Sequence, residues 1–389
     1  AKYLKQKGDN VIGYDQRISY VTNLLNQDGI KVVHTLEEIA YKPDSFYIYS
    51  SAIPIESERF KDFYDKKNVV SRPEYLQNLS ENHRIIGITG THGKTSTTAL
   101  LSHIFHFNNL NVSYLYGGIT TFNGIGGHYG DPDQPLILET DEAFNTFEKI
   151  NISDLLVLNV DSDHLDYFKN IVNYKDAFYK VMKNVTDNLV VNNDDLNIKS
   201  MKELKKSVAY GKDISADFKV QSPGIFIYKN NKYEIKSDII GDHFKSNMLG
   251  AIILALLNGI EIKDSLNAIE SFPGVKRRIE LIGRSKGVSI YDDYGHHPTE
   301  MEATITALKQ QTDNELHVVF QPHRYTRTKE YFNLFKDSLK LADYAIVTDI
   351  YPAGESPIPG ISSKNFEEES IKYLKSIRYV PEYLSKKVQ

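Results

Sequence analysis

A short loop at residues 90–95, Gly-Thr-His-Gly-Lys-Thr, constrains the fold of this chain more than any other segment. The apolar run Ile85–Ile88 before it predicts a buried strand, and Ser96–Phe107 after it predicts a helix. Strand, glycine loop, Lys-Thr and helix is an arrangement in which backbone N–H groups and a helix N-terminus bind nucleotide phosphates. The segment therefore predicts a phosphate-binding site in an α/β domain.

Each part of the loop has a chemical role in this interpretation. Glycines let backbone N–H groups approach an anion closely, the Lys94 ammonium can neutralise β- and γ-phosphate oxygens, and the Thr95 hydroxyl can bind Mg²⁺. Two residues separate the glycines, whereas the common phosphate loop has four. The alternative is a tight strand-to-helix turn with a solvated lysine. The residues expected to contact the nucleotide are Gly90, Thr91, His92, Gly93, Lys94, Thr95 and Ser96.

Composition excludes several classes of protein. With 389 residues the chain is expected to form two or three domains. A formal charge of −5 gives no global basic field for nucleic acid, and the absence of cysteine excludes disulfides and thiolate chemistry. No apolar run reaches the roughly 18 residues that span a bilayer. We expect a cytoplasmic protein with no nucleic-acid partner and no membrane insertion.

Alternating strand and helix patterns run along the chain and predict parallel sheets. We predict an N-terminal domain at 1–82, a central nucleotide-binding domain at 83–276 and a C-terminal domain at 277–389. The expected strands are Val11–Asp15, Lys31–Val33, Ser45–Ser50, Lys67–Ser71, Arg84–Thr89, Val112–Tyr116, Pro135–Glu139, Leu155–Val160, Asn188–Asn192, Val288–Asp292, Leu316–Gln321 and Tyr344–Asp349. The expected helices include Ser19–Asp28, Ile55–Asp65, Ser96–Phe107, Tyr174–Lys183, Ser246–Leu257, Glu302–Lys309 and Phe332–Leu339, and Lys219–Ile240 reads as a β-hairpin at a sheet edge.

Acidic residues follow the apolar strand at Leu136–Leu138. Ligands bind beyond the carboxyl ends of parallel strands, so Glu139 is expected beside the loop, where its carboxylate can bind Mg²⁺. The alternative is a solvated acid cluster at a strand end. Whether Asp141 or Glu142 also acts is left open.

Two further segments combine strand ends with chemically active side chains. His323, Arg324 and Arg327 follow a strand and offer donors to carboxylate or phosphate, although a surface basic patch would look the same. The run from Asp292 to His297 contains two acids and two histidines. A transition-metal site is the alternative there, although adjacent histidines rarely supply its geometry.

Several of these segments together resemble the Mur ligase family. The resemblance rests on Gly90–Ser96, Tyr291–Glu300, Phe320–Thr328 and Tyr351–Glu355, which occur in the family's order and cover nearly the whole chain. It implies an α/β fold of three domains around a central cleft, with a Rossmann-like N-terminal domain, a central phosphate-loop ATPase domain and a Rossmann-like C-terminal domain.

The resemblance also implies an activity. The expected reaction is ATP- and Mg²⁺-dependent joining of L-alanine to the lactyl carboxylate of UDP-N-acetylmuramate through an acyl phosphate, in peptidoglycan precursor synthesis. The two substrates would be the partners, and the chain would be a monomer or homodimer. The alternatives are a recycling ligase that attaches a tripeptide to the same nucleotide, and a nucleotide-gated binding protein.

Individual roles follow from the resemblance, residue by residue. Metal binding is implied for Thr95, Glu139 and His164; nucleotide binding for His243, Asn247 and Arg278; substrate binding for Asp292, Tyr294, His297, His323, Arg324, Arg327, Tyr351 and Gly354; and catalysis for Lys94, His297, Arg324 and Arg327. Ordinary structural roles compete with these: a capping or core histidine at 164, a helix N-cap at Ser246, a solvated basic pair at 277–278 and a simple turn at 352–354. Phe244 stands where the family usually has an asparagine.

The family also places a glycine-rich loop that binds UDP upstream of the first residues seen here. Ala1–Gly8 reads as the end of a helix capped by Gly8, and a parallel sheet would place an earlier strand before it. The segment Arg378–Gln389 stops before the family's last strand. We therefore expect this sequence to lack the first strand and glycine loop of the N-terminal domain, and the end of the C-terminal domain.

Overall fold

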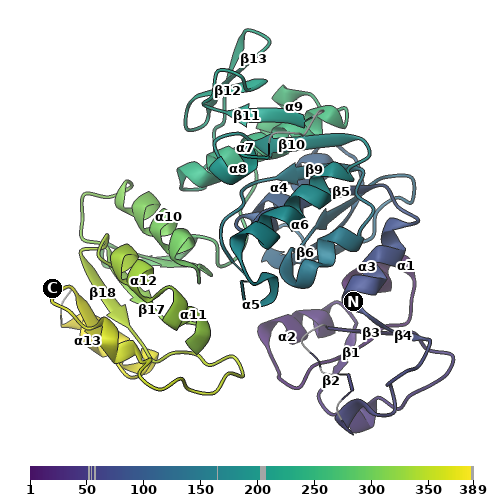
Figure 1. Cartoon of the computed structure of the whole chain (residues 1–389), viewed down its shortest axis with the longest axis horizontal. Helices are drawn as coiled ribbons and strands as arrows, with labels where there is room; N and C mark the ends of the chain where they lie inside the picture. Colours follow the sequence, from purple (N-terminus) through teal and green to yellow (C-terminus); the bar gives the residue numbers. More distant parts are fainter. Residues whose placement is uncertain (51–52, 54, 57, 164, 202–206, 387–389) are drawn as a thin grey trace. The chain divides into compact units, whose positions relative to one another are not determined.

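The structure, a computed structural model, describes residues 1–50, 53, 55–56, 58–163, 165–201 and 207–386. The chain forms two compact units (Figure 1). The first comprises Ala1–Asp238 with Lys245–Lys276, and the second comprises Ile239–Phe244 with Arg277–Gln389. The domain boundary predicted after residue 82 falls inside the first unit and stays a prediction.

The N-terminal part of the first unit contains two short parallel strand pairs. They are β1 (Ile12–Tyr14) with β2 (Lys31–Val33), and β3 (Tyr47–Tyr49) with β4 (Val69–Ser71). The accompanying helices are α1 (Lys2–Lys7), α2 (Tyr20–Gln27), η1 (Leu36–Glu38) and α3 (Arg72–Ser80). Helix α1 ends at Gly8, whose φ of 104° is the left-handed conformation that glycine tolerates, as its sequence predicted.

The helix predicted over 55–65 is wrong. Its described part contains only the 3₁₀ turn η2 (Glu58–Phe60), followed by turns. The ring of Phe63 packs edge-on against Tyr41 and Tyr47, and Asp65 has a φ of 56°. Aromatic packing from another part of the chain therefore overrides the helical pattern.

A ten-stranded sheet forms the centre of the first unit, in the order β14-β13-β12-β11-β10-β9-β5-β8-β6-β7. Its strands are β5 (Ile85–Thr89), β6 (Ser113–Thr120), β7 (Gly124–His128), β8 (Leu136–Glu139), β9 (Asp154–Val157), β10 (Asn188–Asn192), β11 (Ser207–Gly211), β12 (Phe218–Ser222), β13 (Ile225–Tyr228) and β14 (Asn231–Glu234). In this order, the neighbouring strands β12, β11, β10, β9, β5, β8 and β6 all pair in parallel, so β5 lies between β8 and β9. The α/β class predicted from the alternating pattern is confirmed.

Helices cover both faces of this sheet, which explains the continuous apolar runs of its central strands. The helices of the unit are α4 (Lys94–Phe107), η3 (Ala143–Lys149), α5 (Leu165–Phe168), α6 (Ile171–Lys183), α7 (Leu196–Lys199), α8 (Asp242–Leu257) and α9 (Ile262–Glu270). Tyr174 and Phe178 of α6 pack with Leu155 and Val157 in one buried cluster. Helix α4 contacts β6 and β8, and α8 approaches Leu156 on the face opposite to that cluster (Figure 1).

Antiparallel strands extend the sheet at both ends. The predicted edge hairpin is confirmed, because β13 and β14 pair antiparallel around Lys229 and Asn230, whose positive φ values of 46° and 64° suit a two-residue hairpin turn. At the other edge, β6 runs past its predicted end at Tyr116 and pairs antiparallel with β7. Sequence reasoning missed β7, whose glycines and histidine give a weak strand signal.

The second unit combines a hairpin and a small parallel sheet. Its strands are β15 (Glu280–Ser285), β16 (Val288–Asp292), β17 (His317–Phe320), β18 (Tyr344–Val347) and β19 (Ile371–Tyr373), and its helices are α10 (Pro298–Lys309), α11 (Tyr325–Glu330), α12 (Phe332–Leu339), η4 (Ser363–Phe366), η5 (Ile377–Tyr379) and α13 (Val380–Ser385). Strands β17, β18 and β19 are parallel, whereas β15 and β16 form a separate antiparallel pair. Sequence reasoning missed β15.

This topology brings three strand ends of the first unit together. Because β9, β5 and β8 are adjacent and parallel, the segments that follow them meet at one edge of the sheet. These segments begin at Gly90, Thr140 and Leu158. Among the described residues, no helix combines the length and the apolar composition needed to cross a bilayer.

Candidate active site

The glycine loop turns sharply between β5 and α4. Gly90 has a φ of 140°, and a Cβ there would lie 3.0 Å from Leu158 Cβ and 3.1 Å from the Asn159 backbone. Gly93 has a φ of 85°, and its Cβ would lie 2.4 Å from Asn247 Nδ2. Both positions favour glycine because their positive φ strains other residues, and at Gly90 a Cβ would also meet the Asn159 backbone.

The segment after β9 fixes the loop from one side. The Thr91 N–H donates to the Asn159 carbonyl over 3.1 Å. The Asn159 side chain accepts from the His92 N–H at 2.8 Å and donates to the His92 carbonyl at 3.0 Å. The Thr91 hydroxyl accepts from the Asp161 N–H at 2.8 Å. These bonds hold the loop backbone in one conformation, and Asn159 is a residue that sequence reasoning missed.

Lys94 begins α4, and its side chain folds back over the loop. Its Nζ donates to the Gly90 carbonyl at 2.7 Å and to both carboxylate oxygens of Glu142, at 3.0 and 2.8 Å. Asp141 lies farther away, with 3.9 Å between its Oδ1 and Nζ. The side chain of Glu142 is only 1% exposed and that of Asp141 is 44% exposed, so Glu142 is the acid that pairs with the lysine.

The charge of Lys94 is held by this pair. Burial opposes the ammonium form, but the carboxylates of Glu142 and Asp141 outweigh it and raise the pKa of Lys94. Burial raises the pKa of Glu142 although Lys94 acts against the change. The result is a protonated lysine whose counter-ion is deeply buried.

Thr95 and Glu139 lie together as the sequence predicted. The Thr95 hydroxyl donates to Glu139 Oε1 at 2.6 Å, and the Gly117 N–H donates to Glu139 Oε2 at 2.5 Å. A Cβ at Gly118 would come within 2.6 Å of Thr95 Cγ2, so β6 needs glycine where it passes this pair. A hydroxyl and a carboxylate are oxygen donors that Mg²⁺ prefers, so the pair fits the expected ion.

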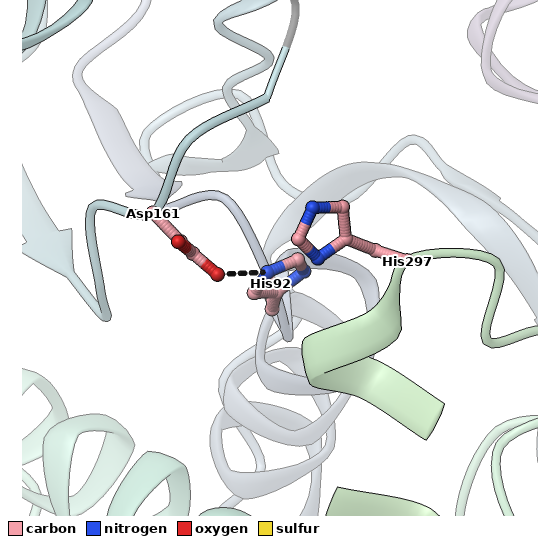
Figure 2. A group of neighbouring side chains, drawn as sticks. All are labelled: His92, Asp161 and His297. Carbon is pink, nitrogen blue, oxygen red and sulfur yellow. Dashed lines mark hydrogen bonds and ion pairs between the residues drawn. The ribbon is translucent and has the colours of Figure 1, made fainter. Parts of the chain in front are cut away.

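His92 lies beside an acid from the end of β9. Its Nε2 is 3.3 Å from Asp161 Oδ2 (Figure 2). The side chains are 16% and 36% exposed, so the pair borders on solvent. His297, drawn in the same figure, belongs to the second unit and is described with it. The predicted metal ligand His164 lies outside the described residues.

The predicted nucleotide contacts on α8 and after it have different surroundings. The Asn247 side chain lies against Gly93 of the loop. Helix α8 begins at Asp242, so Ser246 lies inside it and the alternative of an N-cap at Ser246 is wrong. His243 packs against Phe244 with 4.3 Å between ring centres, and Phe244 is buried, which explains how an apolar residue occupies that position.

In the second unit, Arg278 lies among the predicted substrate residues. Its guanidinium is 5.3 Å from the Tyr294 ring centre and 3.8 Å from Glu300 Oε1. Arg277 pairs with Asp292 over 3.2 Å. Both arginines therefore have partners, although the Arg277 side chain is 56% exposed, and the role of Arg278 stays a prediction.

His297 is more buried than its predicted role in substrate binding suggests. It is 3% exposed, and its Nδ1 accepts from the Thr299 N–H at 3.4 Å as the N-cap of α10. Its ring packs against Tyr331 at 4.8 Å.

The loops after β17 and β18 meet and hold the basic cluster. The Tyr351 N–H donates to the Pro322 carbonyl and the Arg324 N–H donates to the Tyr351 carbonyl, both at 2.8 Å. The Tyr351 ring stacks on His323 at 5.4 Å. Arg324 has a φ of 73°, which is strained for a residue with a side chain. Strain of this kind is typical of functional loops whose conformation is fixed by the surrounding structure.

Glu355 supports the same cluster from the β18 loop. Its carboxylate accepts from the Thr326 N–H at 3.0 Å and from the Thr326 hydroxyl at 2.6 Å, and it lies 3.9 Å from Arg324 Nε. Burial lowers the pKa of His323, and the positive charge of Arg327 acts in the same direction. Gly354 has a φ of 90°, so the turn at this position requires glycine.

Residues 88–255 match the Mur ligase middle domain, and residues 277–384 match the Mur ligase glutamate ligase domain. The chain belongs to the Mur ligase family. It is 36% identical to the UDP-N-acetylmuramate–L-alanine ligase of Caldicellulosiruptor saccharolyticus, over 98% of this chain and 88% of that protein. The protein of the same name from Cytophaga hutchinsonii is 32% identical over 93% of this chain and 82% of its own length.

Solved structures of the family share the fold. The UDP-N-acetylmuramate–alanine ligase MurC of Thermotoga maritima aligns with a TM-score of 0.79 at 23% identity, over 97% of this chain and 88% of its own. The murein peptide ligase of Psychrobacter arcticus aligns with a TM-score of 0.70 at 20% identity, over 98% and 89%. The family and the three-domain α/β fold class predicted from the sequence are confirmed. The roles of individual residues stay predictions.

Proposed function

We propose that this chain joins L-alanine to the lactyl carboxylate of UDP-N-acetylmuramate, using ATP. The observation that carries the proposal is the 36% identity, over 98% of the chain, to a Mur ligase of that name. The buried loop with Lys94, Thr95 and Glu139 supports it, since phosphoryl transfer needs a cation and a metal site beside the nucleotide.

The reaction has two steps. A carboxylate oxygen of the sugar nucleotide attacks the γ-phosphorus of ATP, and ADP leaves with the electron pair of the broken P–O bond. The amine of alanine then attacks the acyl phosphate carbon, the tetrahedral intermediate expels phosphate, and the ammonium proton passes to solvent or a base. Both steps depend on positioning and on neutralising charge.

Residues of the first unit serve the phosphoryl step in this proposal. The loop N–H groups and Lys94 bind the phosphates. Thr95 and Glu139 would bind Mg²⁺, which neutralises charge on the phosphate oxygens. Asn159 keeps the loop backbone oriented through its two bonds to His92.

Residues of the second unit serve the acceptor step. Arg324 and Arg327 provide planar guanidinium groups for carboxylate and phosphate, and Glu355 orients the loop that carries them. Asp292, Tyr294, Tyr351 and Gly354 contribute to the same substrate surface. His297 supports this surface from its buried position at the start of α10.

Phosphate release measured with each substrate omitted in turn tests the proposal. We expect release that requires both UDP-N-acetylmuramate and L-alanine, with a product of the corresponding mass. Faster product formation with the tripeptide L-alanyl-D-glutamyl-diaminopimelate than with alanine would favour the recycling ligase. ATP hydrolysis that ignores both substrates would favour a nucleotide-gated binding protein.

A further inference from the structure

We propose that Glu142 is an internal substitute for the phosphates of ATP: it holds Lys94 while the loop is empty, and the nucleotide must displace it. The proposal rests on the proposed function, in which Lys94 binds ATP. Sequence reasoning left open whether Asp141 or Glu142 acts, and Glu142 is the one that hydrogen-bonds to Lys94.

The surroundings of Lys94 satisfy the ammonium without any ligand. Its Nζ lies within 3.2 Å of four acceptor atoms: the carbonyls of Gly90 and Thr91, at 2.7 and 3.2 Å, and the two Glu142 oxygens, at 3.0 and 2.8 Å. An ammonium has three protons to donate. A phosphate oxygen that takes a bond from Lys94 must therefore replace at least part of this set.

A hydrogen bond from Tyr174 of α6 also holds Glu142 in place. The Tyr174 hydroxyl donates to Glu142 Oε1 at 3.3 Å and lies 2.9 Å from the Thr91 hydroxyl. Thr91 in turn bonds to the backbone of Asp161. The carboxylate is thus connected to the loop at two points, through Lys94 and through Tyr174.

Electrostatics predicts whether Glu142 strengthens or weakens ATP binding. A buried cation that loses its closest counter-ion is strongly destabilised, and a buried carboxylate next to bound phosphate adds like-charge repulsion. Glu142 therefore stabilises the empty loop and opposes the loaded one. Removing its charge should make ATP bind more tightly, because phosphate then supplies the counter-ion that Lys94 lacks.

Calorimetric titration with ATP, with and without Mg²⁺, tests this in Glu142→Gln. We expect the dissociation constant to fall about tenfold in the variant. The midpoint of thermal unfolding should fall without nucleotide and should rise more on adding ATP than it does in the parent chain. Turnover number and Michaelis constant for ATP should fall together, since products that carry phosphate leave more slowly.

Two further variants keep the test decisive. Asp141→Asn removes the same charge one residue away, 3.9 Å from Nζ and more exposed, and should change ATP affinity less than Glu142→Gln does. Tyr174→Phe loosens Glu142 without removing it and should tighten ATP binding by a smaller factor. If Glu142→Gln does not fold, ATP binding by Tyr174→Phe tests the proposal instead.

The outcomes separate this inference from the proposed function. Weaker or unchanged ATP binding in folded Glu142→Gln overturns the inference, because the carboxylate would then support the nucleotide complex. The assignment of Lys94 to ATP fails instead if the parent chain does not bind ATP, or if Lys94→Ala binds it as tightly as the parent does.

Discussion

The nucleotide loop of the first unit and the basic cluster of the second both combine basic and acidic side chains, but they differ in how deeply these side chains are buried. Around the loop, Lys94 and Glu142 are 13% and 1% exposed, and the acceptors of Lys94 follow the adjacent parallel strands β5 and β8. In the basic cluster, the side chain of Arg324 is 45% exposed, and Tyr294 and Tyr351 are 48% and 40% exposed. The charged side chains at the nucleotide loop are buried and paired with each other, whereas the basic cluster presents its donors to solvent.

This difference predicts where a substitution acts. A change in the buried loop should affect folding stability and catalysis together, since its charges compensate each other out of water. A change in the exposed cluster should affect substrate use alone, because solvent screens charges that lose a partner. Four experiments test this comparison.

Lys94→Ala should have the largest effect. We expect ligation to fall by about 10³-fold, because the charge that neutralises the transferring phosphoryl group is lost. The midpoint of thermal unfolding should also fall, since Glu142 is left buried without its cation. Lys94→Ala combined with Glu142→Gln should recover stability but not activity. Surface Lys199→Ala, which breaks an exposed pair with Asp213, is the control. Equal stability of the single and double variants would contradict the comparison.

Glu139→Gln should reduce turnover by about 10²-fold and shift the Mg²⁺ dependence to higher concentration. The amide keeps one oxygen for Thr95 or Gly117 but loses the charge that binds the ion. Initial rates across a Mg²⁺ series measure both effects. Glu270→Gln, at the exposed end of α9, is the matched control. Wild-type rates with an unaltered Mg²⁺ curve would assign the metal to another acid.

Arg327→Lys should raise the Michaelis constant for UDP-N-acetylmuramate about tenfold, because an ammonium cannot reproduce the two parallel bonds of a guanidinium. ATP affinity and thermal stability should stay at parent values, as expected for the exposed cluster. Lys329→Arg on the same helix is the control. A large loss of stability in Arg327→Lys would show that this cluster is as interdependent as the loop.

The smallest effect concerns the proton on His323. Burial and the nearby Arg327 lower its pKa below the ordinary 6.5, so the folded chain resists protonation there. The unfolded chain takes up the proton first as pH falls, and His323 therefore favours folding above pH 6.5 and loses that contribution below it. Two-dimensional NMR of the ring should show a midpoint below 6.5 that rises in Arg327→Gln. A midpoint unaffected by that change would remove Arg327 as a cause.

Local sequence patterns predicted much of the architecture, but they did not predict the elements that depend on contacts with distant parts of the chain. Continuous apolar runs predicted β5, β8 and β9, and the segment after the glycine loop predicted α4, because these side chains pack within one continuous core. Strands β7 and β15 were missed, since glycines and polar residues form strands there only through a neighbouring strand. The helix expected at 55–65 gave way to aromatic contacts of Phe63 with the segment around Tyr41.

The candidate site divides in the same way. The sequence by itself predicted that the glycine loop with Lys94 and Thr95 lies beside Glu139. Both segments directly follow predicted parallel strands, and the ends of such strands meet at one edge of a sheet. Only the tertiary structure decided that Glu142 rather than Asp141 pairs with Lys94, that Asn159 fastens the loop, and that His297 caps a helix. The physical reason is burial: which of two neighbouring carboxylates faces the interior depends on how the backbone turns after β8, and sequence spacing does not record that.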